Sequence, residues 1–454
     1  MNIPSVSQEL TGWGRFTRET CHVFRPEQPR LIERILDSQQ QRHYLPRGLG
    51  RSYGDACLNE GGGVLDFSRL NRMMSFDPDT GVLECEAGVT LADILHVFLP
   101  RGWFLAVTPG TKFVTVGGAI ANDVHGKNHH RDGTFCESVI DFGLYTPAKG
   151  VMLCSREYNP ELFWATAGGV GLTGIILTAR IRLQQVPSAY ISVDYHKSKD
   201  LDDALASMHE TDANYQYSVG WVNCLAKGRH LGQSVLMRGN HAPPDALPAS
   251  LAHTPYTVRH RREKNVPLDF PGFLLNTLSI KAFNTMFYAI HRNSRDVIVD
   301  YDRYFYPLDR ILHWNRMYGK RGFVQYQATL PAQSGHGLVQ LLERLSGSGR
   351  ASFLAVLKCL GPGNPGLLSH PMAGYTLTLD IPNKPGLRAY LQELDRIVLD
   401  HGGRLYLAKD AVASAETIAA MYPELGRFCA IKGRVDPGNL LSSSLARRLG
   451  IVGL

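Results

Sequence analysis

Apolar residues recur at helical spacing in several segments of the chain. Residues 91–99 carry one apolar stripe, and Thr90 and Asp93 have the spacing of a capping box, so a helix is predicted to begin there. A second clear stripe covers residues 387–398 and ends before Gly402, a residue type that commonly stops a helix. Shorter helical patterns lie at 31–35, 161–167, 201–210 and 337–345.

Short apolar runs between these helices predict strands. They occupy residues 43–45, 64–67, 82–88, 138–145, 175–183, 190–196 and 404–412, and we expect a turn at 77–81 to separate the second run from the third. Because short strands alternate with helices, the pattern predicts mixed layers of sheet and helix rather than a helical bundle. A chain of 454 residues is too long for one simple core, so two domains are expected.

Two glycine-rich stretches stand out from this pattern. The first, TPGTKFVTVGGAIANDVHGKNHH at 108–130, has a glycine pair at 117–118 and then three histidines and Lys127 around a further glycine. Backbone N–H groups beside glycines can approach an anion closely, and histidines titrate near neutral pH. For this stretch alone, an ordinary turn with surface histidines explains the pattern equally well.

The second stretch, PRGLGRSYGDAC at 46–57, places three glycines, two arginines and Ser52 in one short loop. Arginine suits bidentate contacts to phosphate, and serine and backbone amides can complete such a site. Alone, this loop is explained equally well as an arginine-containing surface turn. Together the two stretches predict a large anionic cofactor held between loops that are distant in sequence.

A third glycine motif, at 169–174, has the spacing of the dinucleotide-binding fingerprint but not its context. That fingerprint needs a strand before the glycines and a helix after them. Here a helical pattern precedes and a strand pattern follows, so we reject a Rossmann unit. We expect these glycines to allow close backbone packing beside a cofactor.

Charge and cysteine content narrow the possible partners. The formal net charge of +7 suits an anionic substrate or an acidic membrane face, whereas no long Lys/Arg block points to nucleic acid. Eight scattered cysteines without a C-x-x-C pair indicate reduced, packed thiols, and no metal site is expected. No signal peptide or spanning segment is visible, so we expect a cytoplasmic protein, with peripheral contact at the inner membrane face left open.

Residues 251–295 combine a basic run at 259–264 with a mainly apolar stretch at 267–290. Asn276, Lys281 and Asn284 interrupt the apolar stretch, so it cannot span a membrane. One interpretation is an amphipathic surface segment that touches a membrane or covers a lipid-like substrate. The other, which we favour, is a buried core helix beside a solvated charge run.

Longer motifs, spread nearly from end to end, resemble a known family. They are TGWGR (11–15), RGLGRSYGD (47–55), TVGGAI (115–120), HGKNHH (125–130), ELFWAT (161–166), GLTGII (171–176), WNR (314–316), QYQ (325–327), GGRLY (402–406), AKD (408–410) and VDP (435–437). In this order they resemble the FAD-binding family of vanillyl-alcohol oxidase and p-cresol methylhydroxylase. Within it, the chain is similar to the oxidase components of decaprenylphosphoryl-β-D-ribose 2′-epimerases.

The resemblance implies an α+β fold with a two-part FAD-binding domain of mixed α/β layers. The second domain is a substrate domain built on a mainly antiparallel sheet with helices. The implied boundaries are 1–185 for the first part of the FAD-binding domain, 186–401 for the substrate-binding domain and 402–454 for a C-terminal segment that returns to the FAD-binding domain. Relatives with covalent flavin carry a histidine in the first loop, where this chain has Tyr53, so the implied cofactor is non-covalent FAD.

The same resemblance assigns residues to the FAD site and to the substrate pocket. The loop at 46–56 would wrap the pyrophosphate of FAD. The implied cofactor-binding residues are Pro46, Arg47, Gly48, Leu49, Gly50, Arg51, Ser52, Tyr53, Gly54, Asp55, Ala56, Gly110, Thr115, Val116, Gly117, Gly118, Asn122, Asp123, Val124, His125, Ile176 and Tyr406. The implied substrate-binding residues are Lys127, Trp221, Gln325, Gln327, Lys358, Asp380 and Lys409.

Two positions depart from the pattern of the mycobacterial enzymes. Those enzymes have a cysteine two residues before the pocket aspartate, where this chain has Thr378. The sugar chemistry does not need that thiol, but covalent inhibitors aimed at it should fail here. Phe305 and Tyr306 replace a Tyr-His pair, which leaves the exact substrate open.

The implied chemistry is oxidation of a secondary alcohol, for which the protein supplies orientation and a proton acceptor. Lys409 is the first catalytic candidate, and it acts as a base if burial lowers its pKa. The ordinary alternative is a solvent-facing lysine on a strand. His125 is the second candidate, and Lys127 and Lys358 suit an anionic group such as a phosphodiester.

The function implied by the resemblance is FAD-dependent oxidation of the 2′-hydroxyl of a polyprenyl-phosphoryl-β-D-ribose to the 2′-keto sugar. A separate NAD(P)H-dependent short-chain reductase would then complete epimerisation to the arabinose form, an arabinan precursor of the cell envelope. The alternative is an FAD-dependent sugar, alditol or aldonolactone oxidase that uses oxygen. A third hypothesis is a non-catalytic flavin-bound or membrane-docking module that uses residues 251–295 as its contact surface.

Overall fold

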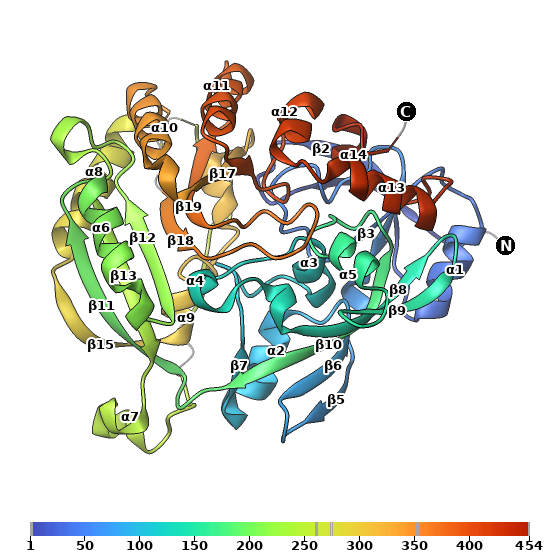
Figure 1. Cartoon of the computed structure of the whole chain (residues 1–454), viewed down its shortest axis with the longest axis horizontal. Coiled ribbons are helices and arrows are strands. Elements are labelled where there is room, and N and C mark those ends of the chain that lie inside the picture. The colour runs from blue at the N-terminus through green and yellow to red at the C-terminus, as the bar shows by residue number, and fades with distance from the viewer. Residues whose placement is uncertain are drawn as a thin grey trace.

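Three larger sheets follow one another along the described part of the chain (Figure 1). The computed structural model describes residues 3–258, 262–272, 274, 276–350, 352 and 354–452. The first sheet has the order β1-β2-β4-β3, and β4 is parallel to both of its neighbours. Its strands are β1 Val6–Thr11, β2 Arg18–Phe24, β3 Tyr44–Arg47 and β4 Gly63–Asp66, and helix α1 Pro29–Asp37 connects β2 to β3. The arginine-glycine loop therefore leaves the end of a sheet strand.

The second sheet has the order β5-β6-β10-β8-β9, and β7 pairs with the end of β10. Its strands are β5 Met73–Asp77, β6 Val82–Glu86, β7 Trp103–Leu105, β8 Val139–Thr146, β9 Gly150–Ser155 and β10 Ile175–Gln185. The helices of this region are α2 Leu91–Phe98, α3 Val116–Ala121, α4 His129–Asp132 and α5 Pro160–Thr166. The glycines at 169–174 lie between α5 and β10, which confirms the helix-before-strand order predicted for them.

The start of α2 confirms the predicted capping box. The Thr90 hydroxyl accepts a hydrogen bond from the Asp93 N–H at 3.0 Å, and the Asp93 carboxylate accepts one from the Thr90 N–H at 3.2 Å. The turn predicted at 77–81 is present, but it joins β5 to β6. The turn separates the runs at 64–67 and 82–88, as predicted, and β5 is a further strand between them that the pattern did not mark; the run at 64–67 pairs with β2 and β3 in the first sheet.

The third sheet is antiparallel throughout and has the order β15-β11-β13-β12-β18-β19-β17-β20. Helices α6 Leu201–Thr211, α10 Gly335–Gly347 and α11 Leu387–Asp400 pack against it, as the helical patterns predicted. The predicted α+β class is confirmed. The strands are β11 Tyr190–Ser198, β12 Tyr217–Val222, β13 Ser234–His241, β15 Ser294–Asp300, β17 Phe323–Pro331, β18 Ala355–Leu360, β19 Gly374–Pro382 and β20 Arg404–Leu405.

The remaining elements connect or follow these sheets. They are α7 Ala249–Ala252, α8 Thr277–Ile290, α9 Tyr301–Phe305, α12 Ala415–Met421, α13 Leu425–Val435 and α14 Ser444–Arg448, with β14 Lys264–Asn265 paired to β16 Ile311–Leu312. The last helices return to the N-terminal elements (Figure 1), where Tyr44 N–H donates to Leu440 O at 2.7 Å. This path fits domain boundaries near 185 and 401, which stay a prediction.

The strand predicted for residues 404–412 is mostly a turn. β20 contains only Arg404–Leu405, and beyond it the N–H groups of Lys409 and Asp410 both donate to Tyr406 O. The Asp410 carboxylate accepts the N–H groups of Val412 and Ala413, each at 3.0 Å. Such local hydrogen bonds replace a sheet ladder, so the strand prediction is wrong beyond residue 405.

The core helix favoured for residues 251–295 is also wrong. Helix α8 lies in this segment, but only Ile280 and Asn284 of its residues are buried. The basic residues 259–261 lie outside the described residues, whereas Arg262 and Lys264 are described and exposed. The amphipathic surface segment is therefore the correct interpretation of α8.

Within the described residues, no helix is long and apolar enough to cross a membrane, and no group of His, Cys, Asp and Glu side chains could hold a metal ion. All eight cysteines are free, and six of them are buried, as expected for packed thiols.

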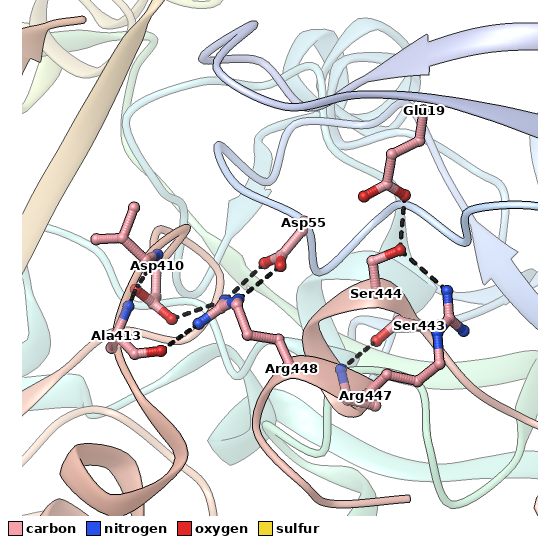
Figure 2. A network of polar contacts seen from close by, with 10 residues as sticks. Glu19, Asp55, Asp410, Ala413, Ser443, Ser444, Arg447 and Arg448 are labelled. Carbon is pink, nitrogen blue, oxygen red and sulfur yellow. Dashed lines mark hydrogen bonds and ion pairs between the residues drawn. The ribbon is translucent and has the colours of Figure 1, made fainter. Parts of the chain in front are cut away.

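One polar network joins the C-terminus to the glycine loop (Figure 2). The Arg448 guanidinium donates to both oxygens of Asp55, each at 2.7 Å, and to Asp410 at 2.9 Å. Its third contact is with Ala413 O at 2.6 Å. Beside it, Ser444 donates to Glu19 at 2.6 Å. Both Arg448-bound carboxylates are buried, so this arginine holds the loop and the 406–413 turn together.

We predict that Arg448→Ala destabilises the protein by about 3 kcal/mol, because it leaves two buried carboxylates without their counter-ion. Urea unfolding followed by circular dichroism measures the change. The matched control is Arg434→Ala, which removes an exposed pair with Glu161. Exposed pairs contribute less than about 1 kcal/mol, so an equal loss in both variants would contradict the prediction.

Candidate active site

The two glycine-rich stretches meet at one deep cavity, as the sequence predicted. The empty volume between the atoms that line this cavity, including the part open to solvent, is about 1780 Å³. A Cβ added to Gly48 would lie 2.3 Å from Thr115 Oγ1, so the first loop can touch the second stretch only with glycine at this position. The opposite wall comes from the third sheet and from the turn at 406–409.

The backbone amides of the first loop are available to a ligand. Within the described residues, the N–H groups at 49–52 have no hydrogen-bond partner, and all four of these residues line the cavity. The amides of the glycine pair are different. Gly117 N–H donates to Ala87 O at 2.8 Å and Gly118 N–H to Thr115 Oγ1 at 3.1 Å, so the donors expected there are already in use. The glycine pair instead allows close packing.

The two arginines of the loop have different environments. Arg47 donates to Cys57 O at 2.6 Å and to Thr11 O at 2.9 Å, so it holds the loop in shape. The Arg51 guanidinium stacks over the Trp13 ring at 3.9 Å, and its buried Nε has no partner among the described residues. Burial lowers the pKa of Arg51. An anion bound here would satisfy Arg51, not Arg47.

The pairing register of the third sheet brings together the side chains of the opposite cavity wall. Trp221 on β12 lies opposite Val356 on β18, Val356 lies opposite Thr378 on β19, and Thr378 lies opposite Gln327 on β17. Residues directly opposite one another in a sheet point to the same face. Four strands that are far apart in sequence therefore place one row of side chains toward the cavity.

The neighbouring row places Asp380 opposite Gln325. The Gln325 amide donates to Asp380 at 2.6 Å, and the carboxylate is fully buried. Burial raises the pKa of Asp380 to about 7. This carboxyl group stands behind Gln325 and does not itself line the cavity.

Lys409 enters the cavity from the turn after β20. Its Nζ lies 3.8 Å from the centre of the Tyr53 ring. Burial, against the opposing effect of Asp380, lowers the pKa of Lys409 to about 7. The ordinary alternative, a lysine directed into solvent, is wrong because this side chain is enclosed. At neutral pH a large fraction of the amine is uncharged and can accept a proton.

Two further half-buried lysines lie near the same wall. Burial lowers the pKa of Lys358, which lines the cavity, to about 8. Burial and the nearby Lys358 lower the pKa of Lys127 to about 7. Lys127 donates to Tyr304 O and lies 4.4 Å over the Tyr304 ring, outside the cavity lining. This region therefore favours a negative charge, which would restore the charged form of each lysine.

A cluster of buried imidazoles lies at the cavity, which His125 lines and His370 does not. His125 Nε2 is 2.9 Å from the Gln327 amide nitrogen, and burial with nearby Lys358 holds the pKa of His125 well below its usual value. His370 stacks on Tyr406 at 4.8 Å and bonds to Thr329 at 2.9 Å. His125 is therefore neutral at physiological pH and can accept a hydrogen bond.

Most of the predicted site residues share this cavity. Among the predicted cofactor residues, all line it except Gly54, Asp55, Val116 and Asp123. Asp55 binds Arg448 instead, and Asp123 accepts from Asn364 at 2.8 Å. Among the predicted substrate residues, Gln325, Gln327, Lys358 and Lys409 line the cavity, whereas Lys127, Trp221 and Asp380 lie behind or beside that wall.

Sequence reasoning missed several residues of the cavity wall. Trp13 and Trp314 both line the cavity, and their ring centres lie 5.9 Å apart. They belong to the motifs TGWGR and WNR, but the sequence assigned no role to either residue. Leu308 and Asp309 also line the cavity, and no sequence motif marks them. His370 was missed because a lone histidine in a loop carries no signal.

The donor set fits FAD. Free amides at 49–52 and the unpartnered Arg51 Nε suit a pyrophosphate, while Ile176 and Tyr406 supply flat apolar surfaces beside the glycines. The residues expected to hold the cofactor thus agree in chemistry with a flavin nucleotide.

Comparisons with known proteins agree with this site. An FAD binding domain family matches residues 22–154, and a D-arabinono-1,4-lactone oxidase family matches residues 377–449. Cytokinin dehydrogenase 10 of Oryza sativa subsp. japonica is 29% identical over 46% of this chain and 41% of its own. L-gulonolactone oxidase of Bos taurus is 28% identical over 36% of this chain and 38% of its own.

A longer match covers nearly the whole chain. Decaprenylphosphoryl-beta-D-ribose oxidase of Mycolicibacterium smegmatis is 38% identical over 456 residues, which include 99% of this chain and 99% of that protein. The match extends through both walls of the cavity, and it confirms FAD as the cofactor. The chain is therefore an FAD-dependent oxidoreductase that belongs to the family of decaprenylphosphoryl-β-D-ribose oxidases.

Proposed function

We propose that this oxidoreductase oxidises the 2′-hydroxyl of a polyprenyl-phosphoryl-β-D-ribose to the 2′-keto sugar. The supporting observation is that two half-buried lysines, Lys358 and Lys409, line one wall of the cavity and a third, Lys127, lies beside it, each with a lowered pKa. Burying several cations together is unfavourable unless an anion joins them. A phosphodiester next to a sugar meets that requirement, whereas a neutral sugar does not.

The chain's own residues then have distinct roles. When bound, FAD supplies a hydride acceptor for the sugar carbon. Uncharged Lys409 accepts the hydroxyl proton, and Lys358 faces the phosphodiester. Gln325 and Gln327 hold the sugar by hydrogen bonds, and Asp380 keeps Gln325 in place at 2.6 Å. Neutral His125 orients the Gln327 amide at 2.9 Å.

Tyr53 favours non-covalent attachment of the cofactor. Its ring is held edge-on against Phe323 at 5.6 Å, with Lys409 over its face. Burial raises the pKa of Tyr53 well above its usual value, so the phenol stays protonated and is a poor nucleophile. We therefore propose that FAD is held by contacts alone.

The proposed product also implies a partner and a location. A 2′-keto sugar needs reduction from the opposite face to become the arabinose form, which the chain's own flavin site does not supply. We propose a separate NAD(P)H-dependent short-chain reductase for that step. Because the substrate carries a polyprenyl chain, we also propose peripheral contact with a membrane.

The alternative function is an aldonolactone or alditol oxidase. Its support is the match of the D-arabinono-1,4-lactone oxidase family to residues 377–449, which include Asp380 and Lys409. That segment supplies the proton acceptor in either function. The two candidate functions differ in whether the lysines of the cavity wall contact a phosphodiester of the substrate.

Anaerobic mixing of the purified protein with polyprenyl-phosphoryl-ribose should bleach the visible absorbance of the flavin, because the sugar carbon gives up its hydride. Stopped-flow absorbance measures the rate. L-gulono-1,4-lactone and alditols serve as controls and should leave the spectrum unchanged. Bleaching by the lactone but not by the lipid-linked sugar would favour the alternative function.

The rate of that bleaching should rise with pH and level off above about 7. Lys409 is inactive as a base while protonated, so the rate is low below its lowered pKa and high above it. The Lys409→Met and Lys409→Arg variants should both lose about 10²–10⁴-fold in rate and show no such rise. Full activity in Lys409→Arg would contradict the role of a base, because a guanidinium keeps its proton.

Lys358→Gln should raise KM for the lipid-linked sugar by about 10–100-fold, since a charged hydrogen bond contributes about 1.5–3 kcal/mol. The change should fall on KM more than on kcat, because Lys358 faces the phosphodiester and not the reacting hydroxyl. Steady-state kinetics with an artificial electron acceptor measures both constants. Lys384→Gln, at a half-exposed position away from the cavity lining, is the control.

A further inference from the structure

Helix α8 Thr277–Ile290 presents an apolar stripe to solvent. Leu278, Ala282, Met286 and Ile290 recur at every fourth position, so they share one face of the helix. Leu278 is 77% exposed, Met286 54% and Ile290 65%. A surface helix normally turns such a stripe toward the core, and this one does the opposite.

The other face of α8 is anchored on the protein. The Asn284 amide donates to Asn223 at 3.1 Å, and the Tyr288 hydroxyl donates to Ser198 O at 3.4 Å. The Phe287 ring lies 4.4 Å from the Trp221 ring. These contacts fix the rotation of the helix, so the outward direction of the apolar stripe is a property of the folded protein.

The apolar surface extends toward the wall of the active-site cavity. Leu268 and Leu274, just before α8, are 76% and 42% exposed. This segment is bonded to the cavity wall: Phe270 N–H donates to Arg316 O at 2.9 Å, close in sequence to the lining residue Trp314. Trp221, beneath α8, shares a sheet row with the lining residue Val356.

Positive charge borders the stripe. Lys281 on α8 and Arg292, two residues after it, are exposed and form no ion pair among the described residues. Arg262 and Lys264, which are further from α8 in sequence, are also exposed and form no ion pair among these residues. Apolar side chains with a basic border match the interface of an anionic bilayer, where acyl chains lie beneath phosphate groups. A second copy of this chain is a poorer match, because pairing the two faces would oppose like charges.

We propose that the apolar stripe of α8, with Leu268 and Leu274, docks this protein on an anionic lipid bilayer. In the docked state the cavity wall at 308–316 lies next to the membrane, so a lipid-linked substrate can enter the cavity while its polyprenyl chain stays in the bilayer. The route of substrate entry rests on the proposed function. The docking itself does not.

The test is sedimentation of the FAD-loaded full chain with vesicles of phosphatidylcholine containing phosphatidylglycerol. The wild-type protein should sediment with these vesicles and bind at least tenfold more weakly to pure phosphatidylcholine or in high salt. The triple variant with Leu278→Glu, Met286→Glu and Ile290→Glu should bind the vesicles more than tenfold more weakly than wild type. The single variant Lys281→Glu should also weaken vesicle binding. The matched control is Val151→Glu/Leu153→Glu on β9, two apolar residues that are 59% and 48% exposed, and it should bind like wild type.

Unchanged flavin absorbance and unfolding temperature establish that each variant is folded. Equal vesicle binding by the α8 variant and the β9 control, or no binding by wild type, overturns the proposal. A wild-type dimer in sedimentation velocity that the α8 substitutions dissociate also overturns it, because the occupant is then a second copy. Bleaching by a short-chain, water-soluble substrate should be equal in all variants. If the short-chain substrate does not bleach the flavin of the wild-type protein, the proposed function is refuted. The vesicle result is unaffected by that outcome.

Discussion

The arrangement of the cavity depends on the half-buried guanidinium of Arg448. This residue, near the C-terminus, bridges Asp55 at the end of the glycine loop and Asp410 next to Lys409. The loop and the turn are already in close backbone contact, with Tyr53 N–H donating to Ala408 O at 2.9 Å. Two carboxylates in such contact would repel each other without a cation between them. Arg448 supplies that cation and so fixes the glycine loop relative to the proposed base.

Desolvation is the second constraint, and it follows from the first. Because the turn is held against the loop, Lys409 is enclosed over the Tyr53 ring instead of extending into water. Enclosure is what lowers the pKa of this amine to the neutral range. The same effect acts on Lys358 and on His125, so one wall holds the proposed base, a neutral imidazole and lysines that favour a bound anion.

The third sheet connects this chemistry to the outer surface. Trp221, on which α8 rests, lies in the same sheet row as the lining residue Val356. The helix is thus attached to the strands that form the cavity wall, while its apolar stripe faces outward. The proposed lipid-linked substrate requires a polar reaction centre close to an apolar phase. The placement of α8 beside this row offers a direct way to meet that requirement.

Local sequence chemistry determined much of this molecule. The capping box at Thr90, the stripe at 387–398 and the glycine loops are short-range patterns, and each marks its element without knowledge of the fold. Motif resemblance identified most of the cavity residues. Sequence could not place Lys409 on a turn, because hydrogen bonds of Asp410 override the strand pattern at 404–412. Nor could it show that α8 faces solvent, since an apolar stripe reads the same whether buried or exposed. Sheet register and the Arg448 bridge join residues hundreds of positions apart, so only the tertiary structure decided which side chains face one cavity.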